Sequence, residues 1–403
     1  MSNNGDAKDD APVHMRWLIL AACVIARSGI GLQFIAIAAL MPLIRADLNL
    51  DYTEIGLLLG LFMVMGIFLS VPSGMIASRW GDRRTLFIGL GALIVAGWVT
   101  AFADGFNAML AGRVLGGVGA VLITVTAAKI LTDWFHGREM TTAMGCLGLS
   151  WPIGIALGLS ILPTIADGFD WRVAVQATVA IPAIAVVVAV LVPRLGRPIT
   201  SKVEVLSMTL WSISRPELWV ILAGGAAWPL MSSGGYVVFS SFASELIVGR
   251  GLTHAQAGLA LGILSWLFIV TIPLGGWIAD RWGGGDRLIW LGCLLSAVTI
   301  SLVPLGGPVL VWVGLTAVMG LTVGPLMALP GQVLSPGGRA MGMGVYYSIY
   351  YLGTVLLPAL AGWLLDATGS PAWVVWFAAG CLVVAPLFIL WARFLQRRWA
   401  LGR

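Results

Sequence analysis

Three basic residues lie within long apolar stretches of the sequence: Arg27, Arg113 and Lys129. A charged side chain in hydrocarbon costs roughly 2.5–3.5 kcal/mol, so such residues are normally kept for a purpose. Arg27 lies 11 residues beyond Arg16, about 16 Å along a helix, which places it near the middle of a bilayer. We therefore expect Arg27 to bind a substrate. The alternative is a structural arginine that joins helices or caps a broken backbone.

The side chains around these positions favour an anionic substrate. A guanidinium group can hold a carboxylate or a planar oxyanion through two hydrogen bonds. Gln33, on the same stretch as Arg27, can donate a further hydrogen bond to an anion. Lys129 is ambiguous, because Asp133 follows it by four residues and such pairs are ordinary at helix ends. Direct contact of Lys129 with substrate and a plain ion pair both remain open.

A second group of candidate binding residues carries hydroxyls and aromatic rings. Tyr346 and Tyr350 share one face of a helix by i,i+4 spacing, and Tyr347 lies on the adjacent face. These tyrosines stand well inside an apolar stretch, so we expect a binding wall; an interfacial belt of aromatic residues is the alternative. The other residues that we expect in this site are Ser232, Tyr236 and Trp151.

The acidic residues and histidines are absent from the middle of the apolar stretches. All 18 Asp and Glu fall in connections or at helix ends. Since a proton symporter usually needs a titratable group deep in its pathway, this distribution favours anion exchange or facilitated movement. The four cysteines fall in four different stretches, and no ligand spacing, nucleophile–base set or nucleotide loop occurs. We expect no metal, no cofactor and no enzymatic activity.

The elements that position these residues follow from composition. Apolar residues make up 59% of the 403 residues, only 10% are charged, and the mean hydropathy is +0.96, so most of the exterior must face lipid. Because open sheets cannot lie in lipid and no barrel alternation occurs, the long apolar stretches predict helices. Twelve stretches are long enough to span a bilayer: 17–41, 53–76, 85–103, 107–131, 142–162, 173–193, 217–240, 256–279, 287–305, 309–330, 341–364 and 372–392.

The placement of the 23 basic residues predicts the orientation. With the N-terminus in the cytoplasm, only Arg45, Arg172 and Arg250 fall in outer connections, while most of the others fall in inner ones. This asymmetry is the positive-inside pattern, so we expect both termini in the cytoplasm. It also accounts for the pI of about 9.3, and we therefore expect no nucleic-acid partner.

The chain contains an internal repeat. A shift of 202 residues aligns 74–81 with 276–283, and the shared triplet Arg-Trp-Gly is not one that an apolar composition produces by chance. We expect two pseudo-symmetric six-helix bundles, 1–193 and 217–403, joined by a cytoplasmic linker at 194–216. The fold class is thus an all-α membrane protein with twelve transmembrane helices.

The repeated segment resembles the signature loop of the major facilitator superfamily, between its second and third helices. The first copy reads Gly-Met-Ile-Ala-Ser-Arg-Trp-Gly-Asp-Arg-Arg from Gly74, and Ser78 stands where the family usually has an acid. The run Arg-Val-Leu-Gly-Gly-Val-Gly from Arg113 is similar to the family's fourth-helix motif. The resemblance implies alternating access, with this loop locking the inner side closed, and we expect Asp133 to pair with Arg79.

The residues to which we assign gating or conformational roles share these motifs or face them. They are Gly74, Arg79, Gly81, Arg83, Arg113, Asp133, Gly276, Asp280, Arg281 and Gly283. Two residues have an alternative interpretation. Ordinary positive-inside anchoring accounts equally well for Arg83, and Arg113 could instead snorkel to the interface.

A weaker resemblance narrows the function. The segments 129–138 and 31–34 are similar to bacterial nitrate, nitrite and cyanate permeases. We predict a multi-pass permease of the cell inner membrane, acting as a monomer in the lipid bilayer. It would move a small anion, either an organic carboxylate or an inorganic oxyanion. The alternatives are a proton-coupled efflux pump for apolar or cationic compounds and a membrane sensor that no longer transports.

Overall fold

The computed structural model describes most of the chain, with short gaps. The described ranges are 13–50, 52–135, 139–192, 213–249, 251, 254–335 and 338–401. Helices fill nearly all of these ranges, and no strand occurs in them, so the predicted all-α architecture is confirmed. Of the predicted linker 194–216, all but the last residues lie outside the described part of the chain.

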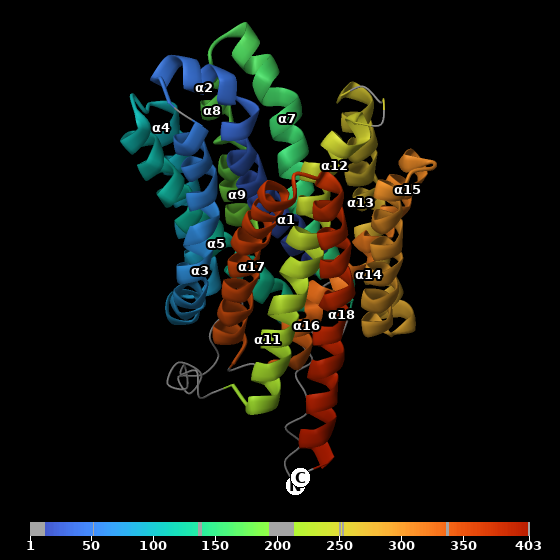
Figure 1. The fold of residues 1–403 in the computed structure, drawn as a ribbon. Helices are drawn as coiled ribbons and strands as arrows, with labels where there is room; N and C mark the ends of the chain where they lie inside the picture. Colours follow the sequence, from blue (N-terminus) through green and yellow to red (C-terminus); the bar gives the residue numbers. More distant parts are fainter. Residues whose placement is uncertain are drawn as a thin grey trace.

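The first part of the chain folds into nine helical segments in the described ranges (Figure 1). They are α1 (Val13–Ala39), α2 (Met41–Leu48), α3 (Tyr52–Trp80), α4 (Asp82–Ala101), α5 (Phe106–Phe135), α6 (Met140–Gly148), α7 (Ser150–Gly168), α8 (Trp171–Ala177) and α9 (Ala180–Leu191).

The second part follows the same all-helical pattern. Its segments are α11 (Arg215–Pro229), η2 (Leu230–Val237), α12 (Val238–Val248), α13 (His254–Trp282), α14 (Gly285–Leu302), η3 (Val303–Leu305), α15 (Val309–Leu315), η4 (Thr316–Thr322), α16 (Val323–Val333), α17 (Arg339–Thr368) and α18 (Pro371–Leu401).

Ten helical segments in the described part of the chain are long and apolar enough to cross a membrane. Their outward faces carry large apolar side chains such as Phe68, Leu291 and Leu390, each more than half exposed. Soluble proteins rarely expose so much contiguous apolar surface, whereas a lipid-facing surface requires it. The predicted spans 217–240 and 256–279 are not among the ten; α11, η2 and α12 occupy the first, and α13 occupies the second.

Several of the apolar stretches depart from regular α-helix, and in two of them a proline stands next to the departure. Pro152 has no backbone N–H, and the helix is interrupted just before it, between α6 and α7 at Leu149. Pro229 precedes η2, which is a π-helix over Leu230–Val237. Such irregular turns are frequent at functional sites.

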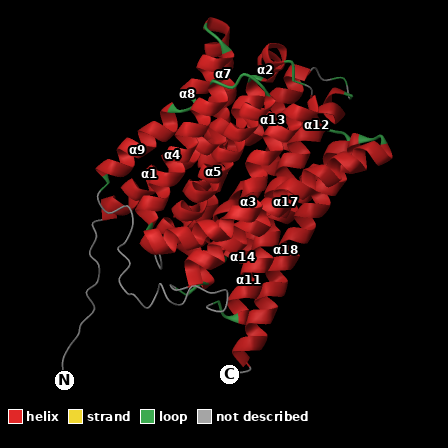
Figure 2. Ribbon diagram, turned by 90° about the vertical axis from the view of Figure 1, so that its left-hand side faces the viewer, coloured by secondary structure: helices red, strands yellow, loops and turns green. Residues whose placement is uncertain are grey.

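The helices share one end, which we call the basal end, where α1, α4, α6, α11, α14 and α17 begin. Ion pairs and hydrogen bonds between neighbouring helices gather there, for example from the Arg393 guanidinium to Asp286 at 2.8 Å and from the backbone N–H of Ser335 to Glu217 at 3.0 Å. The opposite, apical end carries α2, α8 and the end of α7. Figures 1 and 2 show α18 reaching furthest at the basal end and α7 standing at the apical end.

Two close helix crossings join early and late parts of the chain near the basal end. In the α3–α17 crossing, a Cβ on Gly74 would lie 2.2 Å from the carbonyl oxygen of Ala340. In the α6–α13 crossing, a Cβ on Gly276 would lie 2.5 Å from the carbonyl oxygen of Thr141. Only glycine allows backbones to approach so closely. The two repeated loops therefore each place a glycine at a helix–helix contact.

Candidate functional site

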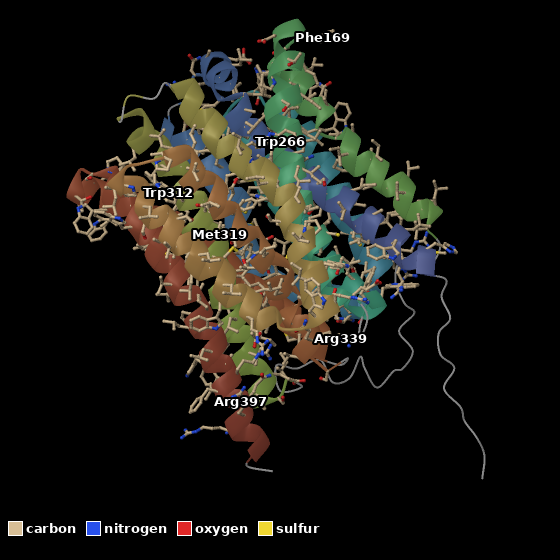
Figure 3. The ribbon with its side chains drawn as sticks, turned by 90° about the vertical axis from the view of Figure 1, so that its right-hand side faces the viewer. Phe169, Trp266, Trp312, Met319, Arg339 and Arg397 are labelled. Atoms are coloured by element: carbon tan, nitrogen blue, oxygen red, sulfur yellow. The ribbon has the colours of Figure 1, made fainter. Side chains whose placement is uncertain are left out.

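A cavity of about 340 Å³ lies between helices from both parts of the chain. Its walls come from α1, α6 and α7 of the first part and from α11, η2, α13, η4, α16 and α17 of the second. Leu159 on α7 and Trp266 on α13 line it and are also more than half exposed, so the cavity reaches the surface between these two helices. Figure 3 shows Met319 of the lining between Trp266 and the basal Arg339.

Arg27 is the charged residue of this lining. It is 6% exposed, and its Nη1 donates to the carbonyl oxygen of Leu147 at 3.0 Å and to Oγ of Ser150 at 3.3 Å. Both acceptors lie beside Leu149, where α6 and α7 meet. Within the described ranges, Arg27 forms no ion pair with a carboxylate. Its positive charge is therefore held in place by neutral groups and stays available to the cavity.

Aromatic rings form the wall opposite. Trp228 and Tyr350 stack with ring centroids 4.1 Å apart, and Tyr236 contacts Phe268 edge-on at 4.9 Å. Arg27 and Tyr350 line the same cavity. The predicted residues Arg27, Trp151, Ser232, Tyr236 and Tyr350 thus line one cavity.

Four residues predicted for substrate binding lie elsewhere: Gln33, Lys129, Tyr346 and Tyr347. Gln33 Nε2 donates to the carbonyl oxygen of Leu93 at 2.8 Å, so its side chain faces α4. The Tyr346 hydroxyl donates to the carbonyl oxygen of Leu326 at 2.7 Å, and Tyr347 is 2% exposed behind Trp228. For Tyr346 the physical reason is that α11 and α16 cover its side chain, which lies beside Gly224 and bonds to Leu326. Tyr350 is the tyrosine of α17 that lines the cavity.

Arg113 is buried, at 3% exposure, and does not snorkel to a surface. Its guanidinium donates to the carbonyl oxygens of Leu58 at 2.9 Å and Gln33 at 2.8 Å, and it lies 4.4 Å from the ring centroid of Phe62. One side chain on α5 thus binds both α3 and α1. This geometry joins three helices of the first part and offers no group to the cavity.

A buried cluster of four charges closes the basal end. Lys129 Nζ lies 2.7 Å from Oδ2 of Asp82 and 3.2 Å from Oδ2 of Asp133, and Arg339 Nη1 lies 2.7 Å from Oδ1 of Asp133. The expected pairing of Asp133 with Arg79 is wrong, because Arg79 is exposed at the end of α3 and Asp133 faces α17 instead. Arg339, which reasoning from the sequence missed, links the two parts of the chain.

The second repeated loop also reaches across the basal end. Asp280 accepts hydrogen bonds from the backbone N–H of Thr141 at 3.1 Å and of Thr142 at 2.6 Å, so it caps the positive end of α6. Its counterpart in the first loop, Ser78, donates instead to the carbonyl oxygen of Gly74 in its own helix, at 2.8 Å. Because Ser78 stands in place of the acid, it does not make the interhelical hydrogen bonds that Asp280 makes in the second loop.

The remaining loop residues have local roles. Gly81 and Gly283 have φ of +89° and +70°, a conformation that glycine adopts without strain. Arg83 donates to the carbonyl oxygen of Val190 at 3.4 Å. Arg281 is exposed at the end of α13.

Comparison with known proteins decides the family. The family model of the Major Facilitator Superfamily matches residues 22–337. The chain belongs to the major facilitator superfamily. The predicted resemblance is therefore confirmed, and the protein is a multi-pass membrane transporter rather than an enzyme.

Relatives in this superfamily cover nearly the whole chain. The chain is 24% identical over 419 residues to a hexuronate transporter of Bacillus subtilis (strain 168), covering 95% of this chain and 94% of that protein. It is 22% identical over 274 residues to the probable nitrate transporter NarT of Staphylococcus epidermidis, covering 66% and 68%. The structure matches that of the transporter FucP in the outward conformation with a TM-score of 0.74, 16% identity and coverage of 94% and 99%. The fold is therefore that of the superfamily.

Proposed function

We propose that the protein is a secondary transporter that carries a small organic anion across the bacterial inner membrane by alternating access. The observation that carries this proposal is the buried guanidinium of Arg27, which lines the central cavity without a carboxylate partner in the described ranges. A buried charge is costly unless it is paired, so an anionic substrate supplies what the protein does not. No acidic side chain of the described residues lines the cavity, which opposes binding of a cation.

The proposed topology has twelve spans and both termini in the cytoplasm. The halves 1–193 and 217–403 would rock against each other around the cavity, with the basal end as the cytoplasmic side. Two observations support closure at this end: the ion pair of Asp133 with Arg339 and the glycine contacts of the two crossings. The cavity reaches the surface between α7 and α13 beside Leu159 and Trp266, midway along both helices. In the proposed cycle, a state that is closed at the basal end faces outward.

The names of the relatives agree with an anionic cargo. One is named for hexuronate and another for nitrate, both of which are anions. Arg79, Arg83, Arg281 and the glycines of the two loops would act in the conformational change, as would the interhelical contacts of Arg113 and Asp280.

One observation favours a second candidate, an efflux pump for apolar compounds. Most of the side chains that line the cavity are apolar or aromatic, including Trp151, Trp228 and Ile272. An efflux substrate with a positive charge would, however, meet the guanidinium of Arg27 and be repelled. The anionic cargo satisfies both the charge and the lining.

The test is uptake by the purified protein in liposomes, with Arg27→Gln as the variant and Arg398→Gln as its matched control. Arg398 stands near the end of α18, far from the cavity, and its loss removes the same charge. We expect Arg27→Gln to abolish uptake of organic anions and Arg398→Gln to keep it. Equal uptake by Arg27→Gln would refute the anion-anchor role, and binding without any flux would identify a sensor.

A further inference from the structure

The lining of the cavity specifies more than the sign of the charge, provided that the proposed anion transport holds. The guanidinium of Arg27 sits at one side, and the rest of the wall is mostly made of rings, aliphatic chains and thioethers. Lys129 is already paired with Asp82 and Asp133, and Arg113 binds backbone carbonyls outside the cavity. One guanidinium can pair one carboxylate. A second carboxylate on the same substrate would be buried without a partner.

The size of the cavity excludes the smallest anions as well-fitted cargo. A water molecule occupies about 30 Å³ of liquid, so a cavity of about 340 Å³ corresponds to roughly ten water molecules. Nitrate has four non-hydrogen atoms and would leave most of this space unfilled. A substrate of about ten or more non-hydrogen atoms occupies more of this space and leaves fewer unmatched surfaces.

The hydroxyl groups of the wall are few and partly engaged. Ser232 Oγ donates to the carbonyl oxygen of Trp228 at 2.9 Å. Ser160 stands exposed at the rim. A sugar acid brings several hydroxyls, each of which needs a partner when it is buried. The lining carries four hydroxyl groups, those of Ser160, Ser232, Tyr236 and Tyr350, and the rest of its side chains are mostly apolar.

The same wall offers faces that suit an apolar body. The stacked pair of Trp228 and Tyr350 presents ring surface. Met231, Met319 and Met327 are each no more than 3% exposed and line the space beside it. Methionine side chains are flexible and polarizable, and they adapt to ligands of different shape. Such a wall accepts a class of apolar bodies rather than one rigid outline.

From this charge, volume and lining we infer that the substrate is an amphiphilic monocarboxylate, with one carboxylate on Arg27 and an aromatic or similarly sized apolar body between the rings and the methionines. The chemistry differs from that of the polyhydroxylated acid and the inorganic ion for which the two curated relatives are named. The difference lies in the residues of the wall and not in the fold.

The test compares four probes in liposomes that contain the full-length protein: phenylacetate, its uncharged counterpart phenylacetamide, glucuronate and nitrate. We expect saturable uptake of phenylacetate that depends on Arg27. We expect phenylacetamide, glucuronate and nitrate to compete at least about tenfold less well, because each lacks either the charge or the apolar body.

A pair of methionine variants separates the wall from the anchor. Met327→Gln keeps the length of the side chain and adds an amide, so we expect the apparent affinity for phenylacetate to fall about tenfold. Met75→Gln makes the same change on the lipid-facing side of α3, where Met75 is exposed, and should leave the affinity unchanged. Binding measured by thermal shift of each variant distinguishes weaker binding from loss of fold.

The outcomes separate the inference from the proposed function. Arg27-dependent uptake of glucuronate or nitrate without competition by phenylacetate would overturn the inference and leave anion transport standing. The same holds if Met327→Gln binds phenylacetate as tightly as the unaltered protein. If phenylacetamide binds as well as phenylacetate, or if only a lipophilic cation such as tetraphenylphosphonium is carried, the anion proposal itself fails.

Discussion

Replacement of Asp133 by asparagine should open the basal end. Asp133 pairs with both Lys129 and Arg339, and Arg339 is 7% exposed, so the substitution leaves a nearly buried guanidinium without its partner. Breaking a buried pair on one side costs about 3–5 kcal/mol. Because Lys129 keeps Asp82 and Asp133 is 17% exposed on its side chain, we take about 2 kcal/mol for this site.

This cost shifts a conformational equilibrium. The pair of Asp133 with Arg339 joins α5 to α17, and we expect it to break when the basal end opens. A loss of about 2 kcal/mol lowers the ratio of closed to open molecules by a factor of about 30. We expect a population that is open at the basal end to become visible in Asp133→Asn.

Double electron–electron resonance, which measures distances between spin labels, can detect that population. Spin labels at Trp80 and Trp282, which end α3 and α13 and are exposed, report the separation of the two loops. The four native cysteines are replaced first. We expect a longer distance to appear in Asp133→Asn, and the same distance in Arg339→Gln, with no further change in the double variant because both act on one pair.

The matched control is Asp47→Asn, which removes the ion pair of Asp47 with Arg172 at 2.9 Å between α2 and α8. That pair lies at the apical end and within the first part of the chain, so the basal distance should not change. If Asp133→Asn retains the unaltered distance distribution and thermal stability, the charged cluster does not hold the basal end closed, and the reasoning is wrong.

Three further outcomes follow from contacts at the basal end and around α5. Asp280→Asn weakens the cap on α6. We expect the closed basal end to lose about 1 kcal/mol of stabilisation, again measured by the spin-label distance. Gly276→Val forces α6 away from α13 and should abolish transport, whereas Gly56→Val, which meets no atom within 4 Å, should not; equal uptake by both would contradict the crossing. Arg113→Lys replaces a planar fork that reaches carbonyl groups on two helices with a single ammonium group. We expect a lower unfolding temperature, a loss of about 2 kcal/mol, with the affinity for anions unchanged.

Hydropathy predicted the helices well because side chains that face lipid must be apolar. Charge in an apolar stretch likewise drew attention to Arg27, which is buried in the structure. The burial of Arg113 did not follow from the sequence, which left snorkelling to the interface open. The π-helix after Pro229 was not predictable, because proline indicates that a hydrogen bond is lost but not how the next turn is closed.

The composition of the site was only partly predictable. Helical spacing groups Tyr346 with Tyr350, but the neighbouring helices decide which of the two meets the cavity. Met231, Met319 and Met327 carry no local signal, because methionine in an apolar helix is ordinary until the packing around it is known.

Long-range ion pairs were the hardest to predict. Asp133 and Arg339 are separated by 206 residues, and neither stands in a motif that names the other. The motif directed attention to Arg79, which is the nearer arginine in the loop but points to the surface. Only the repeat, which brings the start of α17 beside the end of α5, could have provided the right partner.

The two repeated loops can be compared with each other within one molecule. Ser78 and Asp280 occupy equivalent places after one ancestral duplication, yet only Asp280 bonds to the helix opposite. Each loop is thus a sequence variant of the other, and both occur in the same molecule. Exchanging the two residues leaves the composition and the net charge of the chain unchanged. Any change in function must therefore come from the position of the acid and not from the number of acids.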